Sequence, residues 1–299
     1  MIRSMVSEII PSQDEMDAGA LSPETLARVV RQVEEEGYVI VRSLCPADPL
    51  ETIRHAMDEA WDAFCRKPAW IGGGLIIGHV NSAPPYRRAL IFDDILVNPI
   101  VFQITEGVLG APVVNVKYGG NTNLPGSVPQ MFHSDVPRYD ERTLVVNIPL
   151  GDVDETNGAT QIVPGTHKRA FGFAEALSFE QAGNAVSAVT QTGDVLIRFP
   201  SLLHRGTGNA SENPRHMLGM WHVPVGSERD EKTPPLFLKR DCKDWADVHG
   251  SRLRTEICEA DHSPFSPNYF PPGPIGAARE MVYRCFPATY RRIKALSGG

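Results

Sequence analysis

The chain lacks most of the features that mark secreted or metal-clustering proteins. It has only five cysteines among 299 residues, and no two of them are spaced as C-x-x-C. They are Cys45, Cys65, Cys242, Cys258 and Cys285. An odd and widely spaced set disfavours both a disulfide framework and a cysteine zinc site. We therefore expect reduced thiols in or near the core.

Long apolar runs and basic runs are also missing. No stretch approaches the roughly 20 apolar residues needed to cross a bilayer, and the N-terminus becomes acidic before a signal-peptide core develops. The 36 acidic residues outnumber the 29 Lys and Arg, and the basic residues are scattered. This distribution of charge excludes a positive electrostatic field that would attract nucleic acid. We expect a cytoplasmic protein with a small-molecule partner, no membrane and no nucleic acid; the oligomeric state stays open, with a homodimer as one alternative.

The first part of the chain has helical periodicity. Ser22-Pro23 and Asp48-Pro49 each supply a helix start, and a third helix is expected from Asn98-Pro99 to Gly110. Gly37 ends the first helix before a short strand, residues 38–41. From 112 to 224 the pattern changes to short β-rich runs separated by turn residues, which is typical of a sandwich or barrel.

These patterns predict one mainly β domain with helical additions. Its parts are a helical N-terminal region at about 1–111, a β core at about 112–224, and a C-terminal lid and helix at about 225–299. The lid is the proline-rich segment DHSPFSPNYFPPGP, and the helix contains Ile275, Met281, Val282 and Phe286.

A candidate metal site begins with His133 and Asp135, two residues apart in QMFHSDVPRYD. Neighbours two apart on a strand share a face, so both can project toward one ion. Alone this pair is weak, because a β-protein of this size contains an H-x-D by chance. His204 follows a strand that ends at Pro200, and two imidazoles with one carboxylate leave open positions on the metal, as in non-haem iron oxygenases. The same set suits a catalytic zinc, so a zinc hydrolase stays an alternative.

Arg215 follows 11 positions after His204 and opens the strand RHMLGMWHV. Its planar guanidinium matches a carboxylate. An arginine at the start of a strand is ordinarily an exposed ion-pair partner, but its place after the second histidine favours anion binding. On this strand Trp221 shares a face with Arg215.

Gln130 to Asp135, then GDVDETNGATQIVPGTHK, then GDVLIRFPSLLHRGTGNASENPR, resemble the phytanoyl-CoA dioxygenase-like family of Fe(II)/2-oxoglutarate oxygenases over roughly 113–222. The resemblance implies a double-stranded β-helix, a jelly-roll or cupin-like core with iron between its sheets. It implies Fe(II), 2-oxoglutarate and O2, with Arg215 on the distal carboxylate and Gln130 beside the metal. His167 is expected to lie outside the metal shell. Further candidates for cofactor binding are Thr160, Asn115 and Ser211.

We therefore expect a dioxygenase that hydroxylates an unactivated carbon of a small molecule in secondary metabolism, releasing succinate and CO2. Desaturation, epoxidation or cyclisation, an acyl-CoA substrate, and a non-catalytic binding barrel stay as alternatives. An uncharged or zwitterionic substrate is preferred. It is expected to reach the iron between a loop at Trp70 to Tyr86 and the segment His262 to Pro274. Candidate substrate contacts are Trp221, Phe132, Tyr86 and Phe265.

Overall fold

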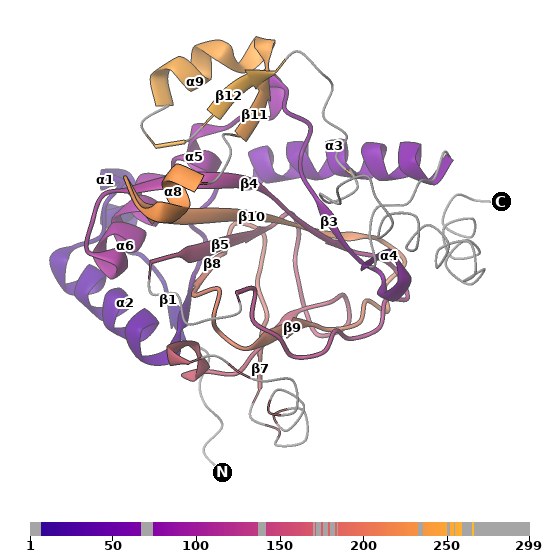
Figure 1. Ribbon diagram of the computed structural model, residues 1–299, viewed down its shortest axis with the longest axis horizontal. Helices are drawn as coiled ribbons and strands as arrows, with labels where there is room; N and C mark the ends of the chain where they lie inside the picture. Colours follow the sequence, from indigo (N-terminus) through magenta and orange to yellow (C-terminus); the bar gives the residue numbers. More distant parts are fainter. Residues whose placement is uncertain are drawn as a thin grey trace.

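The protein is built around two facing β-sheets. The computed structural model describes residues 7–66, 74–136, 142–169, 185–232, 236–249, 252–253 and 255–258, together with 171, 175, 179, 183 and 265. The large sheet has the order β1-β2-β8-β5-β10-β4-β3, and the small sheet has the order β7-β6-β9. Figure 1 shows the small sheet, marked by β7 and β9, facing the large sheet, marked by β4, β10, β5 and β8. This confirms the predicted double-stranded β-helix.

The strands of the large sheet are β1 (Glu8–Ile9), β2 (Tyr38–Val41), β3 (His79–Ser82), β4 (Val113–Asn123), β5 (Leu144–Pro149), β8 (Val195–Arg198) and β10 (Arg215–Pro224). Those of the small sheet are β6 (Thr160–Ile162), β7 (Val186–Ala188) and β9 (His204–Gly206). A separate parallel pair is formed by β11 (Leu236–Lys239) and β12 (Thr255–Cys258).

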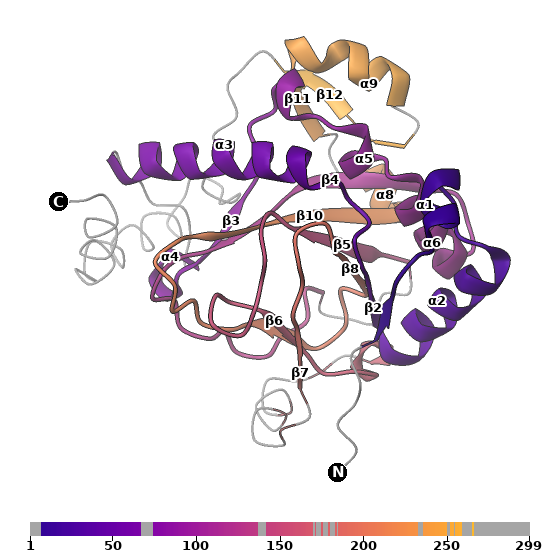
Figure 2. The ribbon, with the colours of Figure 1, turned by 180° about the vertical axis from the view of Figure 1, so that it is seen from behind.

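Helices cover the outer face of the large sheet (Figures 1 and 2). The helices of the described residues are α1 (Gln13–Ala18), α2 (Pro23–Glu36), α3 (Ala47–Arg66), α4 (Gly74–Ile77), α5 (Asp93–Leu96), α6 (Pro99–Leu109), α8 (Glu228–Lys232) and α9 (Lys243–His249); of these, α4 lies beside the end of β3. Short 3-10 turns occur at η1 (Arg88–Leu90), η2 (Thr166–Lys168) and η3 (Arg240–Cys242). Among the described residues, no helix is both long and apolar enough to cross a membrane.

The predicted helix starts are formed by capping residues. The Ser22 hydroxyl accepts a hydrogen bond from the Thr25 amide at the start of α2, and Gly37 ends this helix with φ 85°. The left-handed conformation at Gly37 is inexpensive because glycine has no Cβ. Asn98 caps α6 in the same way, by accepting from two amides of its first turn. Local capping chemistry therefore explains why these three-turn and longer helices were predictable.

The sheet takes strands from outside the expected β core. Although the core was predicted to begin at about 112, β2 pairs with β8 and β3 pairs with β4. The expected loop from Trp70 to Tyr86 contains α4 and β3, and its residues up to 73 lie outside the described part of the chain. The predicted C-terminal helix also lies outside it. The non-local pairing of β2 extends the large sheet beyond the predicted core.

A β-bulge interrupts the pairing of β4 with β10. Met220 lies opposite Tyr118, whereas His222 lies opposite Asn115, so two residues of β4 face the single residue Trp221. The extra residue shifts the alternation of side chains along β4. Asn115 consequently shares the outer, helix-covered face with His222, not the inner face.

Two buried histidines should make the fold sensitive to acid. Burial lowers the pKa of His222 to about 3, helped by the charge of Arg252, and lowers the pKa of His167 to about 4. In the unfolded chain each pKa is near 6.5. The neutral ring is therefore favoured by folding: this stability is complete above about pH 6.5 and is lost as pH falls toward 4 and 3. At pH 5 the loss is about 2 kcal/mol for each histidine.

Urea unfolding near pH 7.5 and pH 5 checks this expectation. The variant His222→Phe keeps an aromatic ring against Phe102, which lies 4.6 Å from the His222 ring, but cannot be protonated. The difference in the free energy of unfolding between the two pH values should shrink by about 2 kcal/mol in this variant. An unchanged difference would show that His222 is not the group that titrates.

Candidate metal centre

Three side chains converge between the two sheets. His133 Nε2 lies 3.9 Å and His204 Nε2 lies 3.6 Å from Asp135 Oδ1. All three ligand atoms lie within 4.8 Å of one another, and within the described ranges no other group of His, Cys, Asp or Glu side chains is so placed. These spacings suit one ion bound by two imidazoles and a carboxylate.

Backbone pairing explains this convergence. The amides of His133 and His204 each donate to the other residue's carbonyl at 2.9 Å, and the Asp135 amide donates to Pro200 O at 2.8 Å. The segment that carries the H-x-D pair is thereby held antiparallel to the chain leading into β9. Residues 133 and 135 project the same way because this segment is extended.

Hydrogen bonds also select the ring nitrogen that faces the ion. His133 Nδ1 lies 2.8 Å from Met131 O, and His204 Nδ1 lies 2.8 Å from Leu202 O. A carbonyl can only accept, so each Nδ1 carries the proton and each Nε2 keeps its lone pair. Burial lowers the pKa of His204 to about 3, with a further lowering by Arg198, so this ring is neutral at pH 7.

Arg198 orients the carboxylate, a role that the sequence did not reveal. Its Nη2 lies 2.8 Å from Asp135 Oδ2, which leaves Oδ1 facing the histidines. Burial alone would raise the pKa of Asp135, but Arg198, His204 and His133 together hold it well below its usual range. Arg198 is in turn fixed by Asn147 Oδ1, which accepts from its Nε at 3.2 Å. The available signal was a charged residue at the end of the apolar run VLIR.

Replacing Arg198 by lysine should weaken iron binding. Lysine keeps the positive charge but cannot contact Asp135 and Asn147 at once, so the carboxylate loses its fixed orientation. Loss of such an outer contact typically lowers metal affinity about 10- to 100-fold. Anaerobic titration with Fe(II) measures this change. The matched control is Arg42→Lys, because Arg42 pairs with Glu8 and Asp194 outside this site. Equal iron affinity in Arg198→Lys and wild type would remove Arg198 from this role.

Arg215 lies at the other end of the same cavity and, among the residues that the structure describes, has no carboxylate partner. Its side chain donates to Asn121 Oδ1 at 2.8 Å and to Gly158 O at 2.9 Å, while its buried Nε has no hydrogen-bond partner. Burial lowers the pKa of Arg215 to about 10. A buried guanidinium without a counter-ion is costly unless a ligand supplies one. The donor set and this unpaired cation together fit a divalent metal with an acidic co-substrate.

The cavity between these two ends has a volume of about 130 Å³ and a polar lining. Gln130 and Thr160 line it, as expected, and Gln130 Oε1 accepts from the Gly206 amide at 2.9 Å, which leaves the Gln130 amide group available to a ligand. Further lining residues that sequence reasoning missed are His79, Asn81, Asn121 and Asn147.

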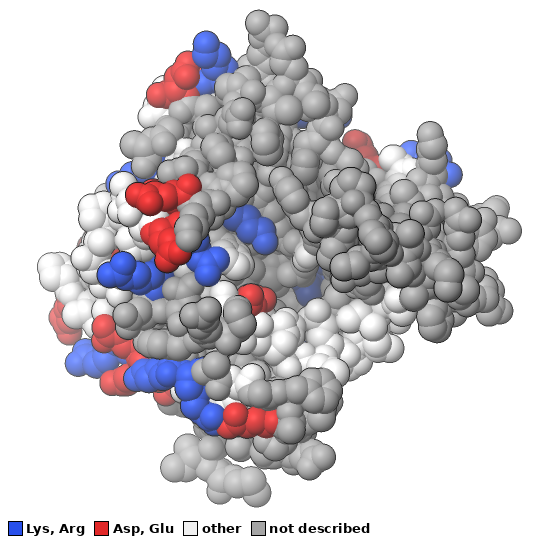
Figure 3. Space-filling view, in the orientation of Figure 1, with Lys and Arg blue, Asp and Glu red and all other residues white. Residues whose placement is uncertain are grey.

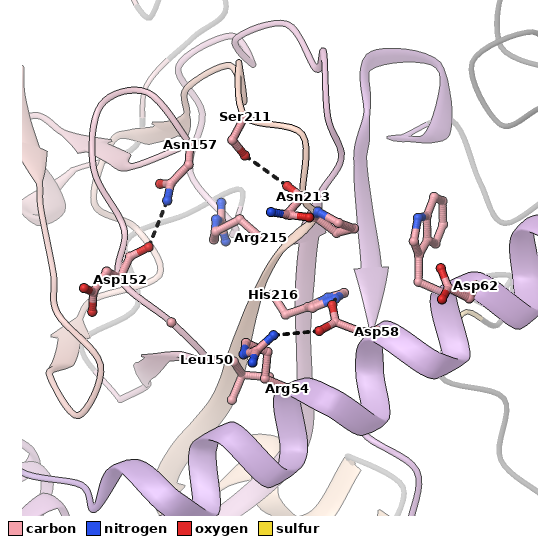
Figure 4. A pocket seen from close by; sticks show the side chains of 13 residues that line it. Arg54, Asp58, Asp62, Leu150, Asp152, Asn157, Ser211, Asn213, Arg215 and His216 are labelled. Atoms are coloured by element: carbon pink, nitrogen blue, oxygen red, sulfur yellow. Dashed lines mark hydrogen bonds and ion pairs between the residues drawn. The ribbon is translucent and has the colours of Figure 1, made fainter. Parts of the chain in front are cut away.

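Ser211 does not contact Arg215. Its hydroxyl donates to Asn209 Oδ1 and Asn213 O, in a second pocket on the far side of Arg215. Figure 4 shows this pocket, with Ser211 directed toward Asn213 and with Arg54 and Asp58 contributed by α3. The expectation that Ser211 assists Arg215 is therefore not supported by a contact.

The remaining candidates lie outside the cavity lining. Asn115 is fully buried on the outer face, below the segment 252–253. Phe132 packs with Val163 and Leu203, and Tyr86 stacks on Tyr118. Phe265, the described residue of the segment His262 to Pro274, packs against Trp61 and Phe64 of α3.

Two expectations concerned residues near the site. His167 stacks on Phe199 and contacts the Glu34 carbonyl, away from the three ligands. Trp221 lies on the inner face of β10 beyond the cavity lining. Lys117 Nζ lies 5.2 Å and Arg229 Cζ lies 5.0 Å from the centre of its ring.

Comparison with known proteins gives one family match. The model of a family described as Phytanoyl-CoA dioxygenase (PhyH) matches residues 33–217. Dioxygenase trt7 of Aspergillus terreus is 25% identical over 219 residues, which cover 68% of this chain and 74% of that protein. Iron/alpha-ketoglutarate-dependent dioxygenase ausU of Aspergillus calidoustus is 24% identical over 252 residues, covering 73% and 76% of the two chains.

Solved structures with the same fold include two proteins of nogalamycin biosynthesis. The alpha-ketoglutarate-dependent carbocyclase SnoK has a TM-score of 0.53 and 21% identity, and covers 72% of this chain and 87% of its own. The epimerase SnoN, in complex with Fe3+, alpha-ketoglutarate and nogalamycin RO, has a TM-score of 0.54 and 19% identity, and covers 68% and 85%. At these identities the likeness concerns the fold.

Proposed function

This chain belongs to the phytanoyl-CoA dioxygenase (PhyH) family and is a non-haem iron, 2-oxoglutarate-dependent dioxygenase, and from this premise we propose that it hydroxylates an unactivated carbon of a small molecule in secondary metabolism. Its iron ligands are His133, Asp135 and His204, and Arg215 binds the distal carboxylate of 2-oxoglutarate. The products of the co-substrate are succinate and CO2.

One observation supports this assignment above the others. The Nε2 atoms of His133 and His204 and one oxygen of Asp135 face a small polar cavity, whose other end holds a buried arginine that has no counter-ion among the described residues. A zinc hydrolase has no use for such an arginine. A binding barrel without turnover has no need for three converging metal ligands.

The protein's own residues bind and orient. When bound, iron with 2-oxoglutarate supplies the oxidising chemistry, which uses dioxygen to attack a substrate carbon. Arg198 holds Asp135, the two Nδ1–H groups fix the imidazoles, and Arg215 places the co-substrate so that its other end lies toward the ligands. The surrounding sheets shield this space from water only in part, because His133 is 39% and Asp135 26% exposed before a ligand binds.

Turnover of 2-oxoglutarate tests the proposal. Purified protein with Fe(II), ascorbate and oxygen should convert 2-oxoglutarate to succinate, slowly without substrate and faster with it. Zn(II) in place of Fe(II) should give none. Absence of succinate with Fe(II) bound would favour a barrel without turnover, and hydrolysis of esters or amides with Zn(II) would favour the hydrolase alternative.

The outcome of the oxidation is a separate question, because one fold hosts many reactions. The two nogalamycin proteins are named as a carbocyclase and an epimerase. Desaturation, epoxidation and cyclisation therefore stay as alternatives to hydroxylation. The mass of the product separates hydroxylation and epoxidation, which add one oxygen, from desaturation and oxidative cyclisation, which remove two hydrogens. NMR of the product then separates the two members of each pair.

Replacing Trp221 by alanine should uncouple the two half-reactions. The ring lies on the inner face beyond the cavity lining, so its loss leaves the co-substrate end intact and removes an apolar contact for substrate. We expect product formation to fall about tenfold or more while succinate formation persists, because small misplacements of a reacting carbon are costly. Trp221→Phe should retain most coupling. Equal ratios of product to succinate in wild type and alanine variant would place the substrate elsewhere.

A further inference from the structure

The inner face of β4 and β10 continues past the metal ligands, and we call this face the floor of the barrel. Three successive parts of it differ in their side chains. Met217 and Asn121, which are paired in register, line the metal cavity. The next inward pair is Gly219 and Gly119, which leave the floor without side chains. Beyond them, at the bulge, Lys117 lies beside Trp221.

Lys117 extends back over the bare part of this floor. Its Cε lies 3.6 Å from the position that a Cβ on Gly119 would take, so its stem follows β4 toward the metal end. The Nζ group lies 5.2 Å from the centre of the Trp221 ring. The Lys117 side chain is exposed to solvent, but the desolvation by the surrounding barrel walls lowers its pKa, while the charge of Asp135 raises it and that of Arg198 lowers it. The ammonium group is therefore within the electrostatic reach of the metal site.

Among the described residues, the positive charge of Lys117 has no matching negative charge. Arg198 is matched by Asp135, and the proposed co-substrate matches Arg215. In the part of the chain that the structure describes, the ammonium group of Lys117 forms neither an ion pair nor a hydrogen bond. The guanidinium of Arg229 also lies 5.0 Å from the Trp221 ring centre, so two cationic side chains contact this ring. In the space-filling view of Figure 3, both basic (Lys or Arg) and acidic (Asp or Glu) surface lies near the centre of the molecular face that the figure shows.

The same end of the floor offers apolar contact. Trp221 packs with Val114, Val116 and Val223, which line up with it after the bulge. An ammonium group above a bare floor, with an aromatic ring beside it, suits a molecule that has an acidic group on an apolar body. Lys117 is exposed in the free protein, so a neutral molecule that covered it would desolvate the ammonium group without giving it a partner, which is unfavourable.

We propose that the substrate is a carboxylic acid, whose carboxylate binds Lys117 and whose apolar body lies on the Gly119–Gly219 floor against Trp221. The proposal rests on the proposed function of the metal site and names its substrate class. It replaces the expectation of an uncharged or zwitterionic substrate. Two acids then share the barrel, with 2-oxoglutarate at Arg215 and the substrate at Lys117.

Matched acids and amides test the proposal on the holoenzyme. Isothermal titration under anaerobic conditions, with Fe(II) and saturating 2-oxoglutarate, compares 2-naphthoic, decanoic and abietic acids with their primary amides. At least one acid should bind about tenfold or more tightly than its amide, because a hydrogen bond to a charged partner is worth about 1.5–3 kcal/mol. Lys117→Met should remove this preference and Lys117→Arg should retain it. Lys168→Met, at η2 outside the barrel, is the matched control and should also retain it.

The outcomes separate this proposal from the proposed function. If wild type binds Fe(II) and 2-oxoglutarate but shows no acid preference in any pair, the substrate class is wrong and the metal site stands. An acid preference that survives in Lys117→Met would also overturn it. If wild type binds neither Fe(II) nor 2-oxoglutarate, the proposed function itself fails.

Discussion

Alanine in place of His133 or His204 is expected to lower 2-oxoglutarate turnover by at least about 100-fold. Loss of an outer contact to a metal ligand alone lowers metal affinity or activity about 10- to 100-fold, and loss of the ligand should exceed that. The fold should persist, because both rings face the cavity. Succinate formation measures the activity. A second measurement is the rise in melting temperature on adding Fe(II), since a ligand at 100 times its Kd stabilises by about 2.7 kcal/mol.

Asp135 needs a different substitution. Alanine would leave Arg198, which is 7% exposed, as an uncompensated buried charge, and such a loss typically costs about 3–5 kcal/mol. Asp135→Asn keeps the shape and one carbonyl oxygen but removes the charge. It should abolish the Fe(II)-dependent rise in melting temperature. His55→Ala, on an exposed face of α3, is the control for histidine loss. Full turnover in any ligand variant would exclude that residue from the metal site.

Changing Arg215 should weaken 2-oxoglutarate binding and leave iron binding nearly unchanged. Arg215→Lys keeps the charge but loses the planar fork, and Arg215→Met loses both. We expect the Kd for 2-oxoglutarate to rise about tenfold to 100-fold in the methionine variant, from the loss of about 1.5–3 kcal/mol, and less in the lysine variant. The protein without co-substrate should not be destabilised by Met, because an unpaired buried charge is removed.

Anaerobic titrations with Fe(II) and then with 2-oxoglutarate give the two affinities separately. A matched control is Arg205→Lys, because Arg205 bonds Gln161 and stacks on Phe132, away from the lining of the metal cavity. If 2-oxoglutarate binds equally to Arg215→Met and wild type, another cation holds its distal carboxylate, and Lys117 is the next candidate.

What the sequence predicted well was local. Helix caps such as Ser22 and Asn98 act within one turn, so the limits of α2 and α6 follow from a few neighbouring residues. The two-residue spacing of His133 and Asp135 is equally local, because alternation along an extended chain needs no knowledge of the sheet. These features were therefore accessible without the fold.

The structural features that the sequence did not predict depend on pairing between distant segments of the chain. Arg198 reaches Asp135 across 63 positions, and the contact requires the segment that carries Asp135 to pair with residues 200–204, which follow β8. The joining of β2 to β8 is likewise non-local. Asn115 was a candidate for cofactor binding, but the extra residue at the bulge reverses the alternation of β4 and places Asn115 on the outer face. Local periodicity does not reveal an inserted residue of this kind.

The bulge at Val116 and Lys117 divides β4 into two parts, whose side chains alternate between the two faces of the sheet in different registers. Arg215 stays opposite Asn123, and Met217 opposite Asn121, whatever happens beyond the bulge. Deletion of one residue there would exchange inner for outer side chains in the terminal part of β4 and leave the iron end in register. A single-codon insertion or deletion can thus replace several substrate-facing side chains in one evolutionary step. Divergence in substrate choice within such a barrel need not disturb its oxidative chemistry.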